Sequence, residues 1–116
     1  MKYMLLMYAN ESEAPQYTPE EFQAAAKVWS ALAKEAKDAG VLLATNGLSP
    51  STTATTVRVR NGRTLTTDGP FAETHEQLGG YFLLECKDLD EAISWAAKIP
   101  TAQNGSIEVR PLYANS

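Results

Sequence analysis

Residues 1–8, MKYMLLMY, are apolar at nearly every position. Side chains alternate between the two faces of a strand, so this run predicts a first strand that is covered on both faces. The same pattern returns in GGYFLLEC, residues 79–86. We do not expect a secretory signal, because Lys2 is the only charge before the apolar run and no small-residue cleavage site follows it.

Two helices are signalled by their ends. Thr18-Pro19-Glu20-Glu21 offers an N-cap, a proline at the first helical position and a glutamate at the third. Apolar residues then recur at spacings of three and four until Gly40, where the helix is expected to stop. Asp88-x-x-Glu91 predicts a second capped helix, which Pro100 ends.

The remaining strands complete the plan. Thr53–Arg60 and Arg63–Thr67 flank Asn61-Gly62, which favours a type I′ hairpin turn, and shorter runs at 41–45 and 107–110 predict two more strands. The order strand, helix, strand, hairpin, strand, helix, strand is typical of an α+β, ferredoxin-like fold with an inserted β-hairpin. We expect one domain over residues 1–116.

The two-faced strands also predict an assembly. Two helices can cover only one face of such a sheet, and a large bare apolar patch is rare on a monomer. A second copy presenting the same face would cover it, because a two-fold interface is self-complementary. We therefore expect a homodimer with its sheets face to face and a cleft between or beside them.

Composition limits the other partners. The net charge is −4 with a pI near 4.9, and the ten Lys and Arg residues are scattered, so direct nucleic-acid binding is not expected. Arg58, Arg60 and Arg63 gather at the predicted hairpin, where a solvated strand edge explains them. No stretch has the length of a membrane span. The single cysteine, Cys86, cannot form an internal disulfide and fits the reducing cytoplasm.

One central stretch carries a family resemblance. DGPFAET, residues 68–74, followed by EQLGGYFL, residues 76–83, resembles the DGPF-type branch of the YCII-related domain family. The resemblance runs almost end to end, through MLLMY at 4–8, ATTVR at 54–58 and IEVRPL at 107–112. It implies a dimeric α+β barrel, a family without an established general reaction, and a sigma-factor-related transcription regulator as a partner.

The resemblance also implies a catalytic candidate and a departure from it. In related YCII-type proteins a His and Asp pair in the cleft is the candidate catalytic pair. Here the only histidine, His75, lies inside the motif where members commonly carry Lys, and none lies near the start of the first helix.

Asp68 and His75 are the candidate catalytic residues. A carboxylate before Gly69-Pro70 lies at a sharply bent strand end, where Asp68 could act as acid or base. The alternative is that Asp68 accepts backbone hydrogen bonds in its own turn. His75 could exchange a proton near neutral pH, with Glu73 or Glu76 orienting it, or be a solvated loop residue.

The candidate substrate-binding residues are Arg110, Tyr8 and Tyr81. Arg110 could bind a carboxylate in bidentate fashion, or pair with a glutamate across strands. The two tyrosines could line a cavity, or lie in the core or an interface. No cofactor fingerprint and no metal-ligand spacing is present, so no cofactor and no metal site is predicted.

Two functions follow. The first is a cytoplasmic homodimer that binds a small organic molecule in a cleft, with acid–base catalysis by Asp68; whether it is an enzyme stays open. The alternative is a non-catalytic dimerisation or partner-binding module linked to transcription regulation.

Overall fold

The computed structural model describes residues 1–114. The helices are α1 (Pro19–Asp38) and α2 (Leu89–Ala96), and the strands are β1 (Lys2–Ala9), β2 (Leu42–Gly47), β3 (Thr55–Arg60), β4 (Arg63–Asp68), β5 (Gln77–Glu85) and β6 (Ser106–Pro111). Short 3-10 turns follow β1, β2 and α2: η1 (Glu11–Glu13), η2 (Ser51–Thr53) and η3 (Pro100–Gln103). The order of elements agrees with the prediction.

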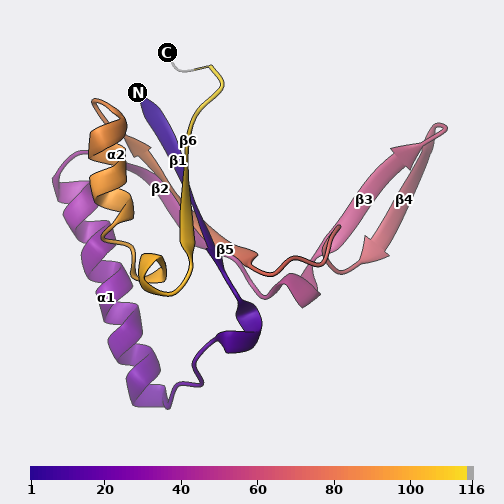
Figure 1. The fold of residues 1–116 in the computed structure, drawn as a ribbon, viewed down its shortest axis with the longest axis horizontal. Helices are drawn as coiled ribbons and strands as arrows, with labels where there is room; N and C mark the ends of the chain where they lie inside the picture. The colour runs from indigo at the N-terminus through magenta and orange to yellow at the C-terminus, as the bar shows by residue number, and fades with distance from the viewer. Residues whose placement is uncertain (115–116) are drawn as a thin grey trace.

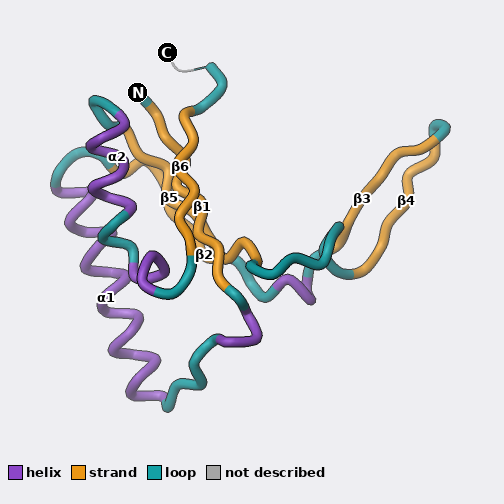
Figure 2. Tube along the Cα trace, in the orientation of Figure 1, coloured by secondary structure: helices purple, strands orange, loops and turns teal. Residues whose placement is uncertain are grey.

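Four strands form one antiparallel sheet in the order β2-β5-β1-β6. Each of the two central strands, β1 and β5, therefore lies between the two strands that begin and end the other β-α-β unit, which is the ferredoxin-like arrangement. Both helices lie on one side of this sheet (Figure 1, Figure 2). The predicted α+β, ferredoxin-like class is confirmed.

The boundaries of α1 follow from its capping residues. The Thr18 hydroxyl accepts from the Glu21 N–H at 3.2 Å, and the Glu21 carboxylate accepts from the Thr18 N–H at 3.4 Å. At the other end Gly40 has a φ of +77°, and the Val41 N–H donates to the Ala36 carbonyl at 3.0 Å. A left-handed glycine and this six-to-one bond form a Schellman ending, so the helix stops where the sequence indicated.

The core lies between the helices and one face of the sheet. Along β1, alternate side chains are buried, and those between them are half-buried. The buried hydrophobic residues are Tyr3, Leu5, Met7, Leu32, Ala36, Val41, Phe82, Leu84, Cys86, Ala92, Ala96 and Ile99. The other face of the same strands is not covered by any helix, as the two-sided apolar pattern predicted.

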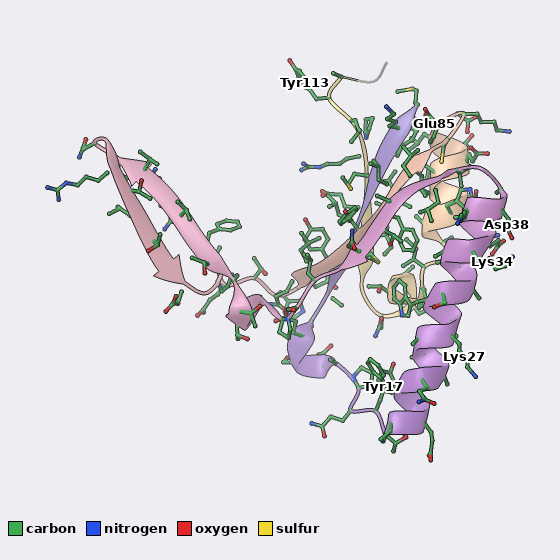
Figure 3. All side chains as sticks on the ribbon, turned by 180° about the vertical axis from the view of Figure 1, so that it is seen from behind. Tyr17, Lys27, Lys34, Asp38, Glu85 and Tyr113 are labelled. Carbon is green, nitrogen blue, oxygen red and sulfur yellow. The ribbon has the colours of Figure 1, made fainter. Side chains whose placement is uncertain are left out.

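The N-terminal half of α1 does not follow the expected packing. The apolar stripe predicted contact along the whole helix, but only Leu32 and Ala36 are buried and Phe22 is 64% exposed. This half extends past the end of the sheet (Figure 1), so there is no strand beneath it. Lys27, Lys34 and Asp38 lie along the outer side of α1 as a whole (Figure 3).

The hairpin of β3 and β4 stands apart from the rest. The two strands pair in register from Thr55↔Asp68 to Arg60↔Arg63 and with no other strand. The radius of gyration is 16.2 Å, against about 13 Å for a compact chain of this length. The difference reflects the hairpin, which projects from the body on the side opposite the helices (Figure 1).

Candidate functional site

The structure contains two large hollows on opposite sides of the sheet. The first, called the helix-side hollow, lies under the overhanging half of α1 and has a volume of about 820 Å³. The second, called the motif-side hollow, lies between the base of the hairpin and residues 70–78 and has a volume of about 680 Å³. Both fall in the size range of small-molecule sites.

The helix-side hollow is built from the sheet floor and one wall of α1. Its lining residues carry no charge: Met7, Ala9, Phe22, Trp29, Ser30, Ala33, Thr45, Asn46, Gly47, Leu48, Gly79, Phe82 and Thr101. Trp29 stacks on Phe82 with ring centroids 6.4 Å apart and an interplanar angle of 19°. In this chain, one fifth of whose residues are charged, an uncharged lining selects for uncharged ligands.

Trp29 supplies the hollow with an available hydrogen-bond donor. Within residues 1–114 its indole N–H donates to no other group, and it is not sealed from solvent. An indole N–H normally finds a partner when it is covered, so a ligand that covers this ring would have to offer it an acceptor. The Thr45 hydroxyl, by contrast, already donates to the Tyr81 carbonyl at 2.9 Å.

In the motif-side hollow several polar side chains are already engaged. The Thr56 hydroxyl donates to the Gly69 carbonyl at 2.9 Å, and the Gln77 amide donates to the Thr74 carbonyl at 2.6 Å. Tyr8 is the one predicted site residue in its lining. These bonds fix the conformation of the loop that forms one wall of the hollow.

Asp68 lies at the base of the hairpin rather than in a cleft. It is the last residue of β4, is exposed, and lines neither hollow. Gly69 follows with a φ of +96°, which favours glycine, and its N–H donates to the Ala54 carbonyl at 2.6 Å. Within residues 1–114 the Asp68 carboxylate has neither a hydrogen-bond partner nor an ion pair, so it does not accept hydrogen bonds in its own turn, and its acid–base role stays a prediction.

The other predicted site residues do not meet Asp68. His75 is exposed in the loop and lines neither hollow. Arg110 is on β6, where its Nε lies 3.3 Å from a Glu108 carboxylate oxygen; the pair runs along one strand and not across two. The Tyr81 hydroxyl accepts from the Asn46 amide at 3.0 Å.

Three of the five predicted residues nevertheless share one surface. The strand register places Tyr8, Tyr81 and Arg110 on the sheet face that the helices leave uncovered. Its apolar centre consists of Met4, Leu6, Tyr8, Tyr81 and Leu83, and we call it the bare sheet face. The Glu108–Arg110 pair and Asn46 lie at its edges.

Glu11, a loop carboxylate that the sequence did not single out, is hydrogen-bonded to two residues that line the motif-side hollow, Ser51 and Gln77. Glu11 accepts from the Ser51 N–H at 2.8 Å and from the Ser51 hydroxyl at 2.7 Å. Its own N–H donates to the Gln77 side chain at 2.9 Å. A glutamate in a polar loop has no spacing signal, because its partners are 40 and 66 residues away.

Cys86 is not a nucleophile in this environment. Its side chain is 2% exposed, and burial, followed by the nearby Glu91 carboxylate, raises the pKa of its thiol to about 11. A thiol is reactive as the thiolate, so this position is inert near neutral pH. In the core Cys86 packs as a small buried hydrophobe.

Neither a metal cluster nor a membrane-spanning helix is seen in the described part of the chain. Residues 1–114 hold no group of three His, Cys, Asp or Glu side chains placed to bind a metal ion. Over the same residues, neither helix is long and apolar enough to cross a membrane.

Comparison with known proteins identifies the family of this chain. The pattern of the YCII-related domain matches residues 1–115. The chain belongs to the YCII-related domain family. An uncharacterised protein of Rhizobium meliloti (strain 1021) is 41% identical to it over 114 residues, which cover 97% of this chain and 92% of that protein. The DGPF-type branch within the YCII-related family stays a prediction.

Proposed function

We propose that this YCII-related protein binds a small, uncharged, largely apolar molecule in the helix-side hollow. The observation that carries the proposal is the uncharged lining of a space of about 820 Å³; this lining includes Trp29, whose N–H has no partner within residues 1–114. A planar ligand could stack against the aromatic wall and offer a carbonyl or ether oxygen to the indole.

Gly79 makes the proposal testable, because it belongs to the lining of the hollow and carries no side chain of its own. A Cβ at Gly79 would meet only the Met7 carbonyl oxygen, at 3.9 Å, so the backbone tolerates a larger residue. Gly79→Leu therefore changes the lining of the hollow, and Gly79→Ala is its matched control. Trp29→Phe keeps a ring but removes the donor.

The experiment is a thermal-shift screen of a metabolite library, enriched in uncharged aromatic carbonyl compounds. A ligand of this hollow stabilises the wild type and Gly79→Ala, loses its effect with Gly79→Leu, and is weakened about 10-fold by Trp29→Phe, the value of one hydrogen bond. Equal stabilisation of wild type and Gly79→Leu would move the binding site elsewhere.

Acid–base catalysis by Asp68 stays a prediction, and the same screen tests it. Asp68 does not line the helix-side hollow, so Asp68→Ala leaves binding there unchanged. A ligand lost specifically in Asp68→Ala would instead favour a catalytic site at the hairpin base, and that variant would then be assayed for turnover of the ligand.

The bare sheet face favours a second role, self-association. Half-buried Met4, Leu6 and Leu83 lie side by side across β1 and β5, since Met4 pairs with Leu83. An apolar centre with charged and amide groups at its edges is the usual anatomy of a protein interface. We propose that two copies join these faces about a two-fold axis. A sigma-factor-related regulator as a further partner stays a prediction.

A further inference from the structure

The projecting hairpin has two unlike faces, and both are exposed. The register places Val57 and Val59 on one face with Thr64 and Thr66, while Arg58 and Arg60 lie on the other with Leu65. Val57 is 59% exposed and Val59 is 60% exposed. A two-stranded ribbon with nothing packed on it is marginal in water, so this one needs a surface to lie against.

The position of the hairpin indicates which molecule could supply that surface. It projects on the side of the sheet that the helices leave uncovered (Figure 1). The motif-side hollow occupies the angle between the two, since Tyr8 of the bare sheet face and Thr56 of the hairpin both line it. Whatever is seated on the bare sheet face therefore lies beside the hairpin.

The charge distribution indicates that the molecule on the bare sheet face is a second copy of this chain. Residues 55–68 contain three arginines and one aspartate, whereas the rest of the chain contains seven basic and thirteen acidic residues. The hairpin is thus net positive, at +2, and the rest of the chain net negative, at −6. Unlike charges favour the approach of a hairpin from one copy to the body of another.

We infer that the β3–β4 hairpin is an arm that lies on a second copy of this chain, with Val57 and Val59 turned onto the partner's body. The inference rests on the dimer proposed above. By symmetry each copy contributes an arm, and the partner's body closes the motif-side hollow, which is incomplete in one chain. Each arm strand is about 20 Å long, enough to reach across a neighbouring sheet.

The test uses the full-length protein and sedimentation velocity over a concentration series. Val57→Ser with Val59→Ser removes apolar groups that the isolated chain does not bury, so each monomer keeps its core. Leu65→Ser is the matched control, because Leu65 is 48% exposed on the opposite face of the same hairpin. We expect the double variant to raise the dimer dissociation constant at least about 100-fold and the control to change it less than about 3-fold.

The outcomes separate the two proposals. A monomeric wild type refutes the dimer and the arm together. A dimeric wild type whose dissociation constant is unchanged in the double variant, or changed equally by Leu65→Ser, refutes the arm and leaves the dimer. Hydrogen exchange gives a second readout: β3 and β4 amides are protected in the dimer and exchange quickly in the diluted monomer if the arm lies on the partner.

Discussion

Gly105 is the position where one added methyl group should disrupt the sheet. It precedes β6, next to the point where Tyr8 of β1 pairs with Ser106. A Cβ at Gly105 would lie 2.2 Å from the Tyr8 carbonyl oxygen and 3.2 Å from the Ala9 Cα, whereas real Cβ atoms essentially never come within 3.0 Å. Because the nearest atom is backbone, strand and loop must separate by about 1 Å.

The expected loss of folding stability follows from that separation of strand and loop. Overpacking a tight site costs about 1–3 kcal/mol, and the parting of β1 from β6 at Ser106 adds a weakened hydrogen bond, so we expect Gly105→Ala to lower the free energy of unfolding by about 3 kcal/mol. For a chain of this size that corresponds to a fall in Tm of about 10 °C. Gly79→Ala is the control, since its Cβ has room, and stability should be unchanged or rise by up to about 1 kcal/mol.

Urea unfolding followed by circular dichroism measures both variants. Midpoints are compared at one protein concentration, because dimerisation would make stability depend on it. If Gly105→Ala unfolds at the same urea concentration as Gly79→Ala, the close approach of residue 105 to β1 is not present in solution, and the β1–β6 register described above is wrong.

Three further perturbations test the cap, the buried thiol and the bare sheet face. Thr18→Ala removes the hydroxyl bonded to the Glu21 N–H and should cost about 1 kcal/mol in urea unfolding; no change would mean that the cap is not formed. Cys86 ionises near 9.0 when unfolded and near 11 when folded, so between those pH values the unfolded chain loses a proton that the folded chain keeps. Stability should therefore fall as pH rises through this window, with a shallower slope in Cys86→Ala, and native Cys86 should resist iodoacetamide at pH 8; rapid alkylation there would contradict its burial. Leu6→Glu places a charge on the bare sheet face and should yield monomers in light scattering, while Val28→Glu, on an exposed part of α1, should not; a dimeric Leu6→Glu would exclude this face as the interface.

The helices and strands of the fold could be predicted from interactions between residues close in sequence. Thr18 and Glu21 cap α1 three residues apart, Gly40 ends it, and Asn61-Gly62 joins β3 to β4. Each of these interactions joins residues that are only a few positions apart, so the local sequence contains both partners. The two-sided apolar pattern of residues 1–8 likewise predicted a sheet face that the helices would leave uncovered.

None of the five predicted site residues lines the helix-side hollow, because a sequence motif does not determine where its residues lie in the fold. Asp68 and His75 stand out in the sequence, yet Asp68 ends up on an exposed hairpin strand and His75 on an exposed loop. Tyr8 and Tyr81 do share a surface, as alternation along two paired strands predicts.

The sequence by itself determined the helices, the strands, their order and the two apolar faces of β1, because periodicity and capping act between near neighbours. Only the tertiary structure decided where the hollows lie. Trp29 belongs to the apolar stripe of α1 and packs against the core through Phe82, yet it also lines the helix-side hollow, over which the N-terminal half of α1 extends beyond the sheet (Figure 1). That overhang depends on the angle and register between α1 and the strands, which are set by packing among Leu32, Phe82 and their neighbours and are not encoded in any one segment.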